Sequence, residues 1–470
     1  MPETNVSMNP ASAPKAIRSW QLAIFASLAA PLAAAGTPLA IYLPAYYANE
    51  AGLGLSLVGA IFMFGRLWDA FTDPLVGTLS DRTQSRFGRR KPWIAAGTVL
   101  FLIGAATVFA PAALGVKPSG AWLFGWLFVF YLGWTMIQIP LFAWSGELAA
   151  QYDQRSRVQT YLQVAIATGL LLVLLLPTLL DQRAGPSGAD AGLKVAVMGA
   201  VAAAILVPAV ILALIFVPEP ARPDLPRVKV PVIPALRHAL ADPLLLRILS
   251  SDFAVTLGQL IRSSLFVFFI AFYMGRPGLA TALFLLQYSF GVFAGPIWLR
   301  VGYQIGKHRA AIAGELIQVA INLSLVLVTP DALPLLLGLT VAQGLAQGSG
   351  NLMLRSMVSD VADKHRLETG QETAGLLFSV FSVASKAATA VAIGVALPLV
   401  ALLGFKPGIV NSPQALLSLK LVFALGPALA HLISAALLFR FSLDRSGHDT
   451  IRRALEDQNT PLQLVSNPAE

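Results

Sequence analysis

The chain contains no cysteine among its 470 residues. Disulfides, thiol chemistry and cysteine-based metal sites are therefore excluded. Charge is also scarce, because Asp, Glu, Lys and Arg make up 12% of the residues while 56% are hydrophobic. A soluble protein of this length needs more charge to cover its surface. The composition therefore predicts a polytopic integral membrane protein.

Apolar segments recur along the whole chain, and each is close to the roughly 20 residues that a helix needs to cross a bilayer. We predict an all-α membrane fold with twelve spans, at 19–48, 55–81, 92–113, 120–150, 155–181, 191–218, 250–274, 278–304, 309–329, 332–359, 370–403 and 413–441. Segment edges carry the least information, because the hydropathy pattern changes gradually there.

The formal net charge of +9 is carried by short segments between the spans, which argues against a nucleic-acid surface. Most of the cations follow even-numbered spans, in stretches such as Arg82 to Lys91, Arg222 to Arg247 and Arg440 to Arg453. Positive connectors stay in the cytoplasm. We therefore expect a multi-pass plasma-membrane protein (inner membrane in a bacterium) with both termini cytoplasmic.

The chain also divides into two halves. A connector rich in proline and basic residues, Val217 to Pro243, follows the sixth span, and "DPLVGTLSDRTQSRFGRRK" after span two resembles "GPIWLRVGYQIGKHR" after span eight. We predict a disordered tail (1–18), a six-helix bundle (19–218), a linker (219–249), a second bundle (250–441) and a tail (442–470). Such repeats enclose a site near the membrane midplane and rock against each other.

Two acids lie inside the second predicted span, in "GRLWDAFTDPLVG". Asp69 and Asp73 are four residues apart, so they project from one helix face. A charge at bilayer depth costs about 2.5–3.5 kcal/mol, so such a pair must face a cavity or a partner. The pair could share one proton or hold one Na⁺ ion. In the plainer alternative, Asp73 merely begins the cytosolic end of the span beside Pro74.

Further polar residues lie at membrane depth. Lys386 in span eleven could pair with the two aspartates when their cation is absent, or could face a water-filled vestibule without coupling. Arg262 in span seven is buried by its position. Tyr42, Trp134, Gln138 and Trp144 belong to a group of aromatic and amide side chains suited to a polyhydroxylated ligand, although aromatic residues near helix ends also form interfacial belts. We treat these four and Arg262 as candidate solute contacts.

The connector after span two is a candidate gate. Asp81 and Arg82 end the span, and Arg89 and Arg90 precede the next one. An acid at one helix end that pairs with these arginines can hold the cytoplasmic side in one conformation.

The segments quoted above show a resemblance. "G-x-x-x-D-R" followed by "G-R-R-K" resembles the loop signature of the major facilitator superfamily, and "RLWDAFTDPLVGTLSDRTQSRFGRRKPW" resembles the glycoside–pentoside–hexuronide:cation symporters, the family of the melibiose permease. "IPLFAWSGELAAQYDQRSRV" and "VSDVADKHRLETGQETAGLLFSVFSVASK" extend the resemblance over both halves. It implies the fold of that superfamily, with two six-helix halves that alternate access.

The resemblance also implies roles for particular residues. The family's cation-site aspartates fall on Asp69 and Asp73, its helix-four threonine on Thr135 and its helix-eleven lysine on Lys386. Thr72 stands where sodium-using relatives have asparagine, which favours protons over sodium. Gln138 replaces an aspartate that helps to bind galactosides, and the first span has no acid. The coupling residues are thus present, whereas galactoside recognition is not implied.

These observations favour a secondary active transporter, not an enzyme, that couples H⁺ or Na⁺ to a glycoside, uronide or similar polar solute. We expect no cofactor, no metal other than a Na⁺ ion at the aspartates, and a monomer whose partners are its solute and membrane lipid. A lysophospholipid carrier of the same fold is an alternative, as is a transport-dead sensor. An intramembrane aspartyl protease is a remote alternative, because both acids share one helix and no Gly-x-Gly-Asp segment is present.

Overall fold

A computed structural model describes residues 17–148, 152–185, 187–219, 241–370, 374–441, 443, 447–448, 450–451 and 453–455. Within these ranges every regular element is a helix. The predicted tails 1–18 and 442–470 lie mostly outside the described residues, as does most of the predicted linker.

The first span is continuous from Ser19 to Asn49, but its geometry changes along its length. It consists of α1 (Ser19–Ser27), α2 (Ala29–Thr37), a π-helical turn η1 (Pro38–Tyr42) and α3 (Leu43–Asn49). Proline lacks an amide hydrogen and interrupts helical hydrogen bonding, and this stretch contains three prolines. The other helices of the N-terminal half are α4 (Leu55–Arg82), α5 (Lys91–Phe109), α6 (Gly120–Glu147), α7 (Tyr152–Ala184) and α8 (Ala191–Phe216).

The C-terminal half begins with α10 (Pro243–Phe268), so its first helix starts before the predicted residue 250. A π-helical turn η3 (Phe269–Tyr273) extends α10. The remaining helices are α11 (Ala280–Ile305), α12 (Lys307–Ser324), α13 (Leu333–Ala346), α14 (Ser349–Thr369), α15 (Ala374–Leu402) and α16 (Pro413–Phe439).

The prediction of a single helix at 332–359 is wrong. The chain breaks between α13 and α14, where Gly348 has a φ of 78°. Glycine adopts this left-handed conformation without steric cost. The division explains why eleven segments of the described chain, rather than twelve, are each long and apolar enough to span a membrane. The protein is an integral membrane protein.

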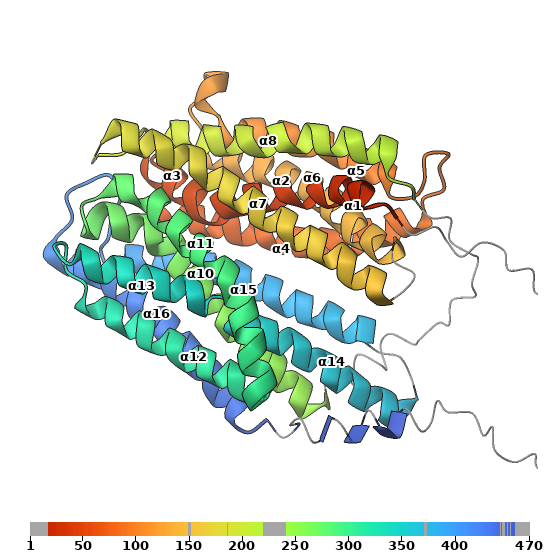
Figure 1. Cartoon of the computed structure of the whole chain (residues 1–470). Coiled ribbons are helices and arrows are strands. Elements are labelled where there is room, and N and C mark those ends of the chain that lie inside the picture. Colours follow the sequence, from red (N-terminus) through yellow and green to blue (C-terminus); the bar gives the residue numbers. More distant parts are fainter. Residues whose placement is uncertain are drawn as a thin grey trace, which may run out of the picture.

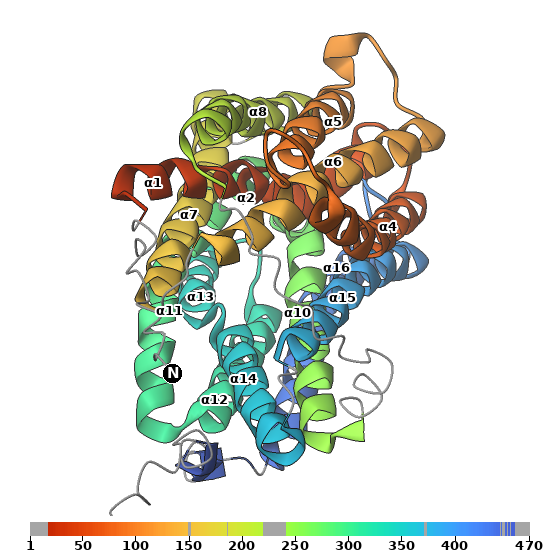
Figure 2. The same cartoon turned by 90° about the vertical axis from the view of Figure 1, so that its right-hand side faces the viewer.

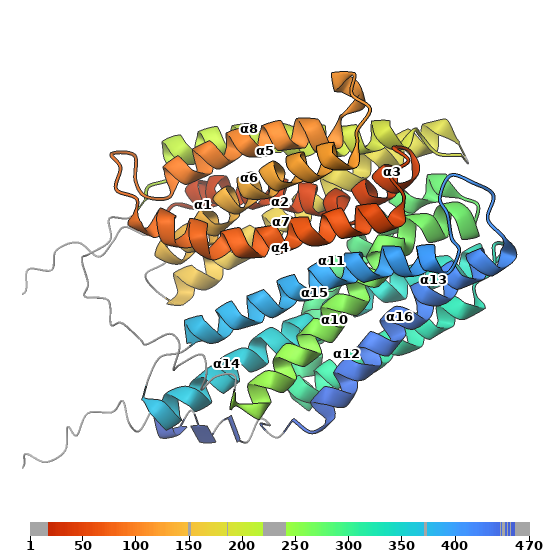
Figure 3. The same cartoon turned by 180° about the vertical axis from the view of Figure 1, so that it is seen from behind.

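The helices form two layers, each made from one half of the chain (Figure 1). The end of α8 and the start of α10 lie at the same end of the molecule, which we call the linker end. The start of α8 and the start of α16 lie at the other end, which we call the far end (Figures 1 and 3). The two layers lie close together at the far end and diverge toward the linker end (Figure 1).

Helices α5 and α6 pack closely because glycines line their interface. A Cβ atom at Gly133 would lie 2.4 Å from the Phe101 amide nitrogen, and one at Gly104 would lie 2.7 Å from Phe130 Cα. Small residues let membrane helices approach until their backbones touch. This packing fixes α6 beside α4, which is the arrangement that builds the candidate site.

The halves are joined by α4 with α15 and by α7 with α11 (Figure 2), and η1 and α3 of the first span also contact α10. In the far-end part of the first pair, a Cβ atom at Gly59 would lie 2.9 Å from Pro398 Cδ. The middle of the same pair holds the predicted acids and lysine.

Candidate cation and solute site

Asp69 and Asp73 lie in the middle of α4, which continues as a helix to Arg82. Asp69 is 2% exposed, and Asp73 is partly buried. Asp73 therefore lies inside the helix rather than at its end, because two further helical turns follow it. Both acids lie on one helix, whereas an aspartyl protease needs them on facing helices.

Threonine hydroxyls lie against both carboxylates. Thr135 on α6 donates either to Asp69 Oδ1, at 2.9 Å, or to Asp73 Oδ1, at 3.3 Å, since a hydroxyl has one proton. The Thr72 hydroxyl lies 3.4 Å from Thr135 Oγ1 and 3.1 Å from the Asp69 carbonyl oxygen. The four predicted cation-site residues are thus brought together, and their oxygens are of the kind that binds Na⁺ or a proton.

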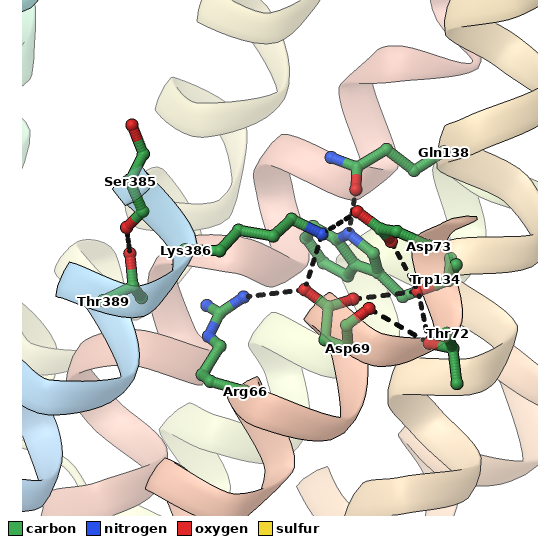
Figure 4. A network of polar contacts seen from close by, with 10 residues as sticks. Arg66, Asp69, Thr72, Asp73, Trp134, Gln138, Ser385, Lys386 and Thr389 are labelled. Carbon is green, nitrogen blue, oxygen red and sulfur yellow. Dashed lines mark hydrogen bonds and ion pairs between the residues drawn. The ribbon is translucent and has the colours of Figure 1, made fainter. Parts of the chain in front are cut away.

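Lys386 reaches this site from the other half of the protein (Figure 4). Its Nζ atom on α15 lies 3.1 Å from Asp69 Oδ2 and also contacts Asp73 Oδ2. One ammonium therefore bridges the two carboxylates. This arrangement differs from a lysine that only faces a vestibule, because a charge of the C-terminal half neutralises charge of the N-terminal half.

Arg66 is a member of the site that the sequence analysis missed. It lies one turn before Asp69 on α4, with Nη1 4.0 Å from Asp69 Oδ2, and its guanidinium lies 5.1 Å from the centre of the Tyr131 ring. With Lys386 it supplies two positive charges opposite two carboxylates, so the cluster is close to neutral. Its position in an apolar span would have identified it, as it did Arg262.

Trp134 and Gln138 lie beside the acid pair on α6 (Figure 4). The Trp134 indole nitrogen donates to Gln138 Oε1 at 3.1 Å, one helical turn away. Because the indole fixes the amide oxygen, the amide nitrogen of Gln138 remains available as a donor. The pair places an indole, 7% exposed and packed against Phe101 and Phe130, and an amide next to the cation site.

Arg262 belongs to a separate polar network in the C-terminal half. Its Nη1 atom donates to Gln287 Oε1 at 3.2 Å, and Gln287 in turn lies 3.5 Å from Gln347 at the break between α13 and α14. In the same half, Gln259 donates to Asn351 at 3.0 Å. The structure does not bring Arg262 to the acid pair.

Tyr42 lies toward the far end, where the halves meet. Its ring centre is 6.0 Å from that of Phe284 on α11, and it lines a cavity of about 410 Å³ with Tyr46, Asp190 and Lys194. Like Arg262, Tyr42 therefore does not belong to the site that Trp134 and Gln138 form.

The prediction that Trp144 contacts a solute is wrong for this conformation. Its side chain is 0% exposed, its ring packs edge-on against Phe25 at 5.2 Å, and its indole nitrogen lies 3.4 Å from the Pro218 carbonyl oxygen. An indole enclosed on all sides has no surface to offer a ligand. Sequence alone could not separate it from Trp134, since both are tryptophans on the same helix.

The predicted gating residues form contacts within the N-terminal half. Arg90 pairs with Asp81 and donates to Ser80 at 2.8 Å. Glu219, which the sequence analysis missed, accepts hydrogen bonds from the backbone amides of Arg89 and Arg90 at 2.7 and 2.9 Å. A carboxylate at a helix N-terminus is favourable. These contacts tie α4, α5 and α8 together, while Arg82 is exposed.

A second inter-half contact, at the far end, was also missed. Asp181 at the end of α7 is buried, accepts from Lys194 at 3.0 Å and accepts a hydrogen bond from Thr281 on α11. Its carboxylate joins α7 and α8 of one half to α11 of the other at the far end.

Breaking this contact should open the far end. In Asp181→Asn and in Thr281→Val, we expect the distances between the halves at the far end to lengthen, because the inter-half hydrogen bond is weakened or lost. Since the protein has no cysteine, spin labels can be attached directly at Leu114→Cys and Val410→Cys, which are exposed. Electron paramagnetic resonance distances that stay unchanged in both variants would contradict this role.

The linker end of the C-terminal half is stabilised by Asp242, which precedes α10. Burial alone would raise the pKa of its carboxyl, but hydrogen bonds from His365, Lys364 and the Leu244 amide outweigh burial and hold that pKa well below its ordinary value. A carboxyl with a lowered pKa stabilises the fold above its unfolded pKa and loses this effect as pH falls.

Asp242→Asn should therefore lower the melting temperature at pH 7, and the difference from wild type should shrink as pH falls below about 4. Asparagine still accepts the helix-capping hydrogen bond, so the change isolates the charge. Asp190→Asn is the matched control, since Asp190 caps α8 in the same way. A difference that stays constant with pH would contradict the assignment.

Comparison with known proteins supplies the family. Residues 24–445 match the family described as MFS/sugar transport protein. The chain belongs to this family. The predicted resemblance to glycoside–pentoside–hexuronide:cation symporters is confirmed, and the protein is a transporter rather than an enzyme.

The relatives are symporters and carriers. A glucuronide carrier protein homolog of Escherichia coli is 24% identical and covers 91% of this chain and 93% of its own length. An isoprimeverose transporter of Lactiplantibacillus pentosus is 23% identical, over 86% and 84%. A sodium-dependent lysophosphatidylcholine symporter of Danio rerio is 23% identical, over 96% and 89%. An uncharacterized symporter of Synechocystis is 30% identical over 34% of this chain and 31% of its own length.

Solved structures confirm the fold. The nucleoside transporter NupG has a TM-score of 0.66 at 12% identity, over 90% of this chain and 99% of that one. The xylose transporter XylE from E. coli, in an inward-open conformation, has a TM-score of 0.61 at 15% identity, over 92% and 99%. The twelve-span design predicted from the sequence is that of the major facilitator superfamily, with its tenth span divided.

Proposed function

We propose that the protein is a symporter that couples cation entry at Asp69 and Asp73 to transport of a glycoside, uronide or similar polar solute. The observation that carries the proposal is the ammonium of Lys386, which comes from the C-terminal half and bridges both carboxylates of the N-terminal half.

The bridge supplies a coupling mechanism. Two adjacent carboxylates in a low-dielectric environment need positive charge, which Lys386 provides in this conformation. A proton or Na⁺ at the pair would supply that charge instead and weaken the hold of Lys386. Cation binding therefore weakens the contact between the halves. This allows the halves to move relative to each other, as alternating access requires.

We favour the proton as the coupling ion. Thr72 stands where sodium-using relatives carry an amide, and its hydroxyl is engaged with the Asp69 carbonyl and with Thr135. It is therefore a poor replacement for an amide oxygen that faces the ion. Sodium remains the alternative, because the threonine and carboxylate oxygens present are hard ligands.

Trp134 and Gln138 support a polar, ring-shaped solute. An indole face stacks on the apolar face of a sugar, and an amide hydrogen-bonds to its hydroxyl groups. Their position beside Asp73 lets a bound solute respond to the state of the cation site. The glucuronide and isoprimeverose relatives carry solutes of this chemistry.

The conformation supports an inward-open state. The halves are held together at the far end by Asp181 and diverge toward the linker end (Figure 1). The linker end carries the cationic connectors, which the positive-inside rule assigns to the cytoplasm. We therefore place the linker end and both termini in the cytoplasm, and we propose a monomer as the transporting unit.

A lysophospholipid is the alternative solute. An apolar groove of about 610 Å³ lies between α10, α15 and α16, lined by residues such as Leu249, Phe253 and Leu429, and could hold an acyl chain. The Danio rerio relative supports this alternative. A lysophospholipid in this groove would not contact Trp134 or Gln138. Substitution of these two residues should therefore impair transport of a sugar but not of a lysophospholipid.

The test is uptake by proteoliposomes with an imposed proton or sodium gradient. We expect a labelled glycoside or glucuronide to accumulate under the proton gradient and Gln138→Ala to raise the KM at least tenfold. Accumulation of labelled lysophospholipid but of no sugar would overturn the solute assignment, and dependence on sodium alone would overturn the choice of ion.

A further inference from the structure

The C-terminal half contains a buried acid–base pair that the proposed function does not use. Glu315 on α12 and His431 on α16 are each 1% exposed, and Glu315 Oε2 lies 2.6 Å from His431 Nδ1. Glu315 lies near the middle of the membrane segment Lys307–Leu327. A charged residue at this depth is costly and calls for a function or a partner.

The helices around the pair leave room for the Glu315 carboxylate and place few charged side chains near it. A Cβ atom at position 350 would lie 2.2 Å from Glu315 Oε1, so Gly350 on α14 makes room for the second carboxylate oxygen. Helix α13 carries no titratable side chain. On α10, Asp252 is buried, and both Glu315 and the exposed Arg355 of α14 act on it electrostatically.

A polar face leads away from the pair along α12. Gln318 and Asn322 follow Glu315 by three and seven residues, so all three lie on one face. Gln318 Oε1 and Asn322 Oδ1 are buried and accept no hydrogen bond within the described residues. Buried acceptors of this kind normally bind water. A row of acceptors that buried water can satisfy therefore runs from Glu315 toward the far end.

We propose that Glu315 and His431 form a second proton-binding site, reached along the polar face of α12 and loaded separately from Asp69 and Asp73. In the loaded pair the proton lies on Glu315 Oε2 and is donated to His431 Nδ1, so the pair is a neutral carboxylic acid and a neutral imidazole. Loss of that proton leaves one negative charge on Glu315, which acts electrostatically on Asp252, and the released proton passes to water along the polar face of α12.

The pair is connected to the coupling lysine without sharing its ligands. Asp252 accepts hydrogen bonds from Asn351, at 3.2 Å, and from Ser385. Ser385 directly precedes Lys386 but points away from the aspartates (Figure 4). A proton gained or lost at Glu315 changes the electrostatic potential at Asp252. Because Asp252 accepts a hydrogen bond from Ser385, this change acts on α15 at the side that does not contact α4.

The test measures protons and needs no solute. Full-length protein in nanodiscs is titrated while infrared spectroscopy follows carboxylic-acid bands and nuclear magnetic resonance follows ¹⁵N-labelled histidine. We expect a titrating acid band that is absent in Glu315→Gln, a histidine signal that moves with it and is absent in His431→Gln, and release of one proton fewer by Glu315→Gln than by wild type.

Controls decide between this site and a fixed ion pair. The Glu315 band should persist in the Asp69→Asn/Asp73→Asn protein, and Gln318→Leu should slow proton release after a pH jump at least tenfold while the protein still folds. A Glu315 that stays ionised beside a permanently charged His431 would overturn the proposal. So would a band lost together with the two aspartates, or unchanged kinetics in Gln318→Leu.

Discussion

Asp69→Asn and Asp73→Asn proteins will exchange solute across a membrane but will not accumulate it against a gradient. Each substitution removes one of the two carboxylates that Lys386 bridges and keeps the size of the side chain. With a single negative charge left, Lys386 and Arg66 together more than neutralise the site, so a cation has no reason to enter. The solute residues Trp134 and Gln138 are untouched, which preserves exchange.

The expected loss is large. At 100 mV, one charge crossing the membrane contributes about 2.3 kcal/mol, equivalent to about a fiftyfold concentration ratio. Accumulation by the variants should fall to a ratio near one under an imposed gradient. Asp331→Asn, at an exposed position in the connector before α13, is the matched control and should accumulate normally. Full accumulation by both Asp69→Asn and Asp73→Asn would sink the coupling assignment.

Lys386→Ala should have the second-largest effect, on both turnover and stability. Removing one partner of a buried charge pair costs about 3–5 kcal/mol, because the remaining charge is left uncompensated. Here two carboxylates would face each other with Arg66 as their remaining described cation, 4.0 Å from Asp69. We expect transport to fall below about a tenth of wild type and the melting temperature to drop.

Two variants make this test specific. Lys420→Ala removes a lysine that is more buried than Lys386 but lies 5.0 Å from the centre of the Tyr273 ring instead of between carboxylates, and this change should affect transport far less. Lys386→Ala/Asp73→Asn should recover part of the lost stability, because the double change removes the repulsion between the acids. A double variant no more stable than Lys386→Ala would show that the lysine acts through packing rather than charge.

Several features followed from sequence because the bilayer constrains sequence strongly. Every backbone polar group of a span must be satisfied internally, so long apolar segments become helices, and a charge within them is conspicuous. Asp69, Asp73 and Lys386 were found in this way. Arg66, Asp252 and Glu315 are also charged residues within apolar spans, but the sequence analysis did not identify them as functional.

Local patterns were less informative where geometry depends on one residue. The break at Gly348 divides the tenth span, yet its glycine resembles others that lie inside continuous helices. Trp134 and Trp144 are ten residues apart on α6 and both are buried, but their neighbours differ: Trp134 donates to Gln138, whereas Trp144 packs against Phe25.

The sequence by itself determined the class of the protein, its division into two halves and the acids that a bilayer tolerates only for a reason. Tertiary structure alone decided which polar side chains meet: Lys386 with Asp69 and Asp73, Thr281 with Asp181, and His431 with Glu315. The partners in these pairs lie at least a hundred residues apart. Helical periodicity specifies the face of a side chain on its own helix, whereas the neighbour of that face is set by how the helices pack.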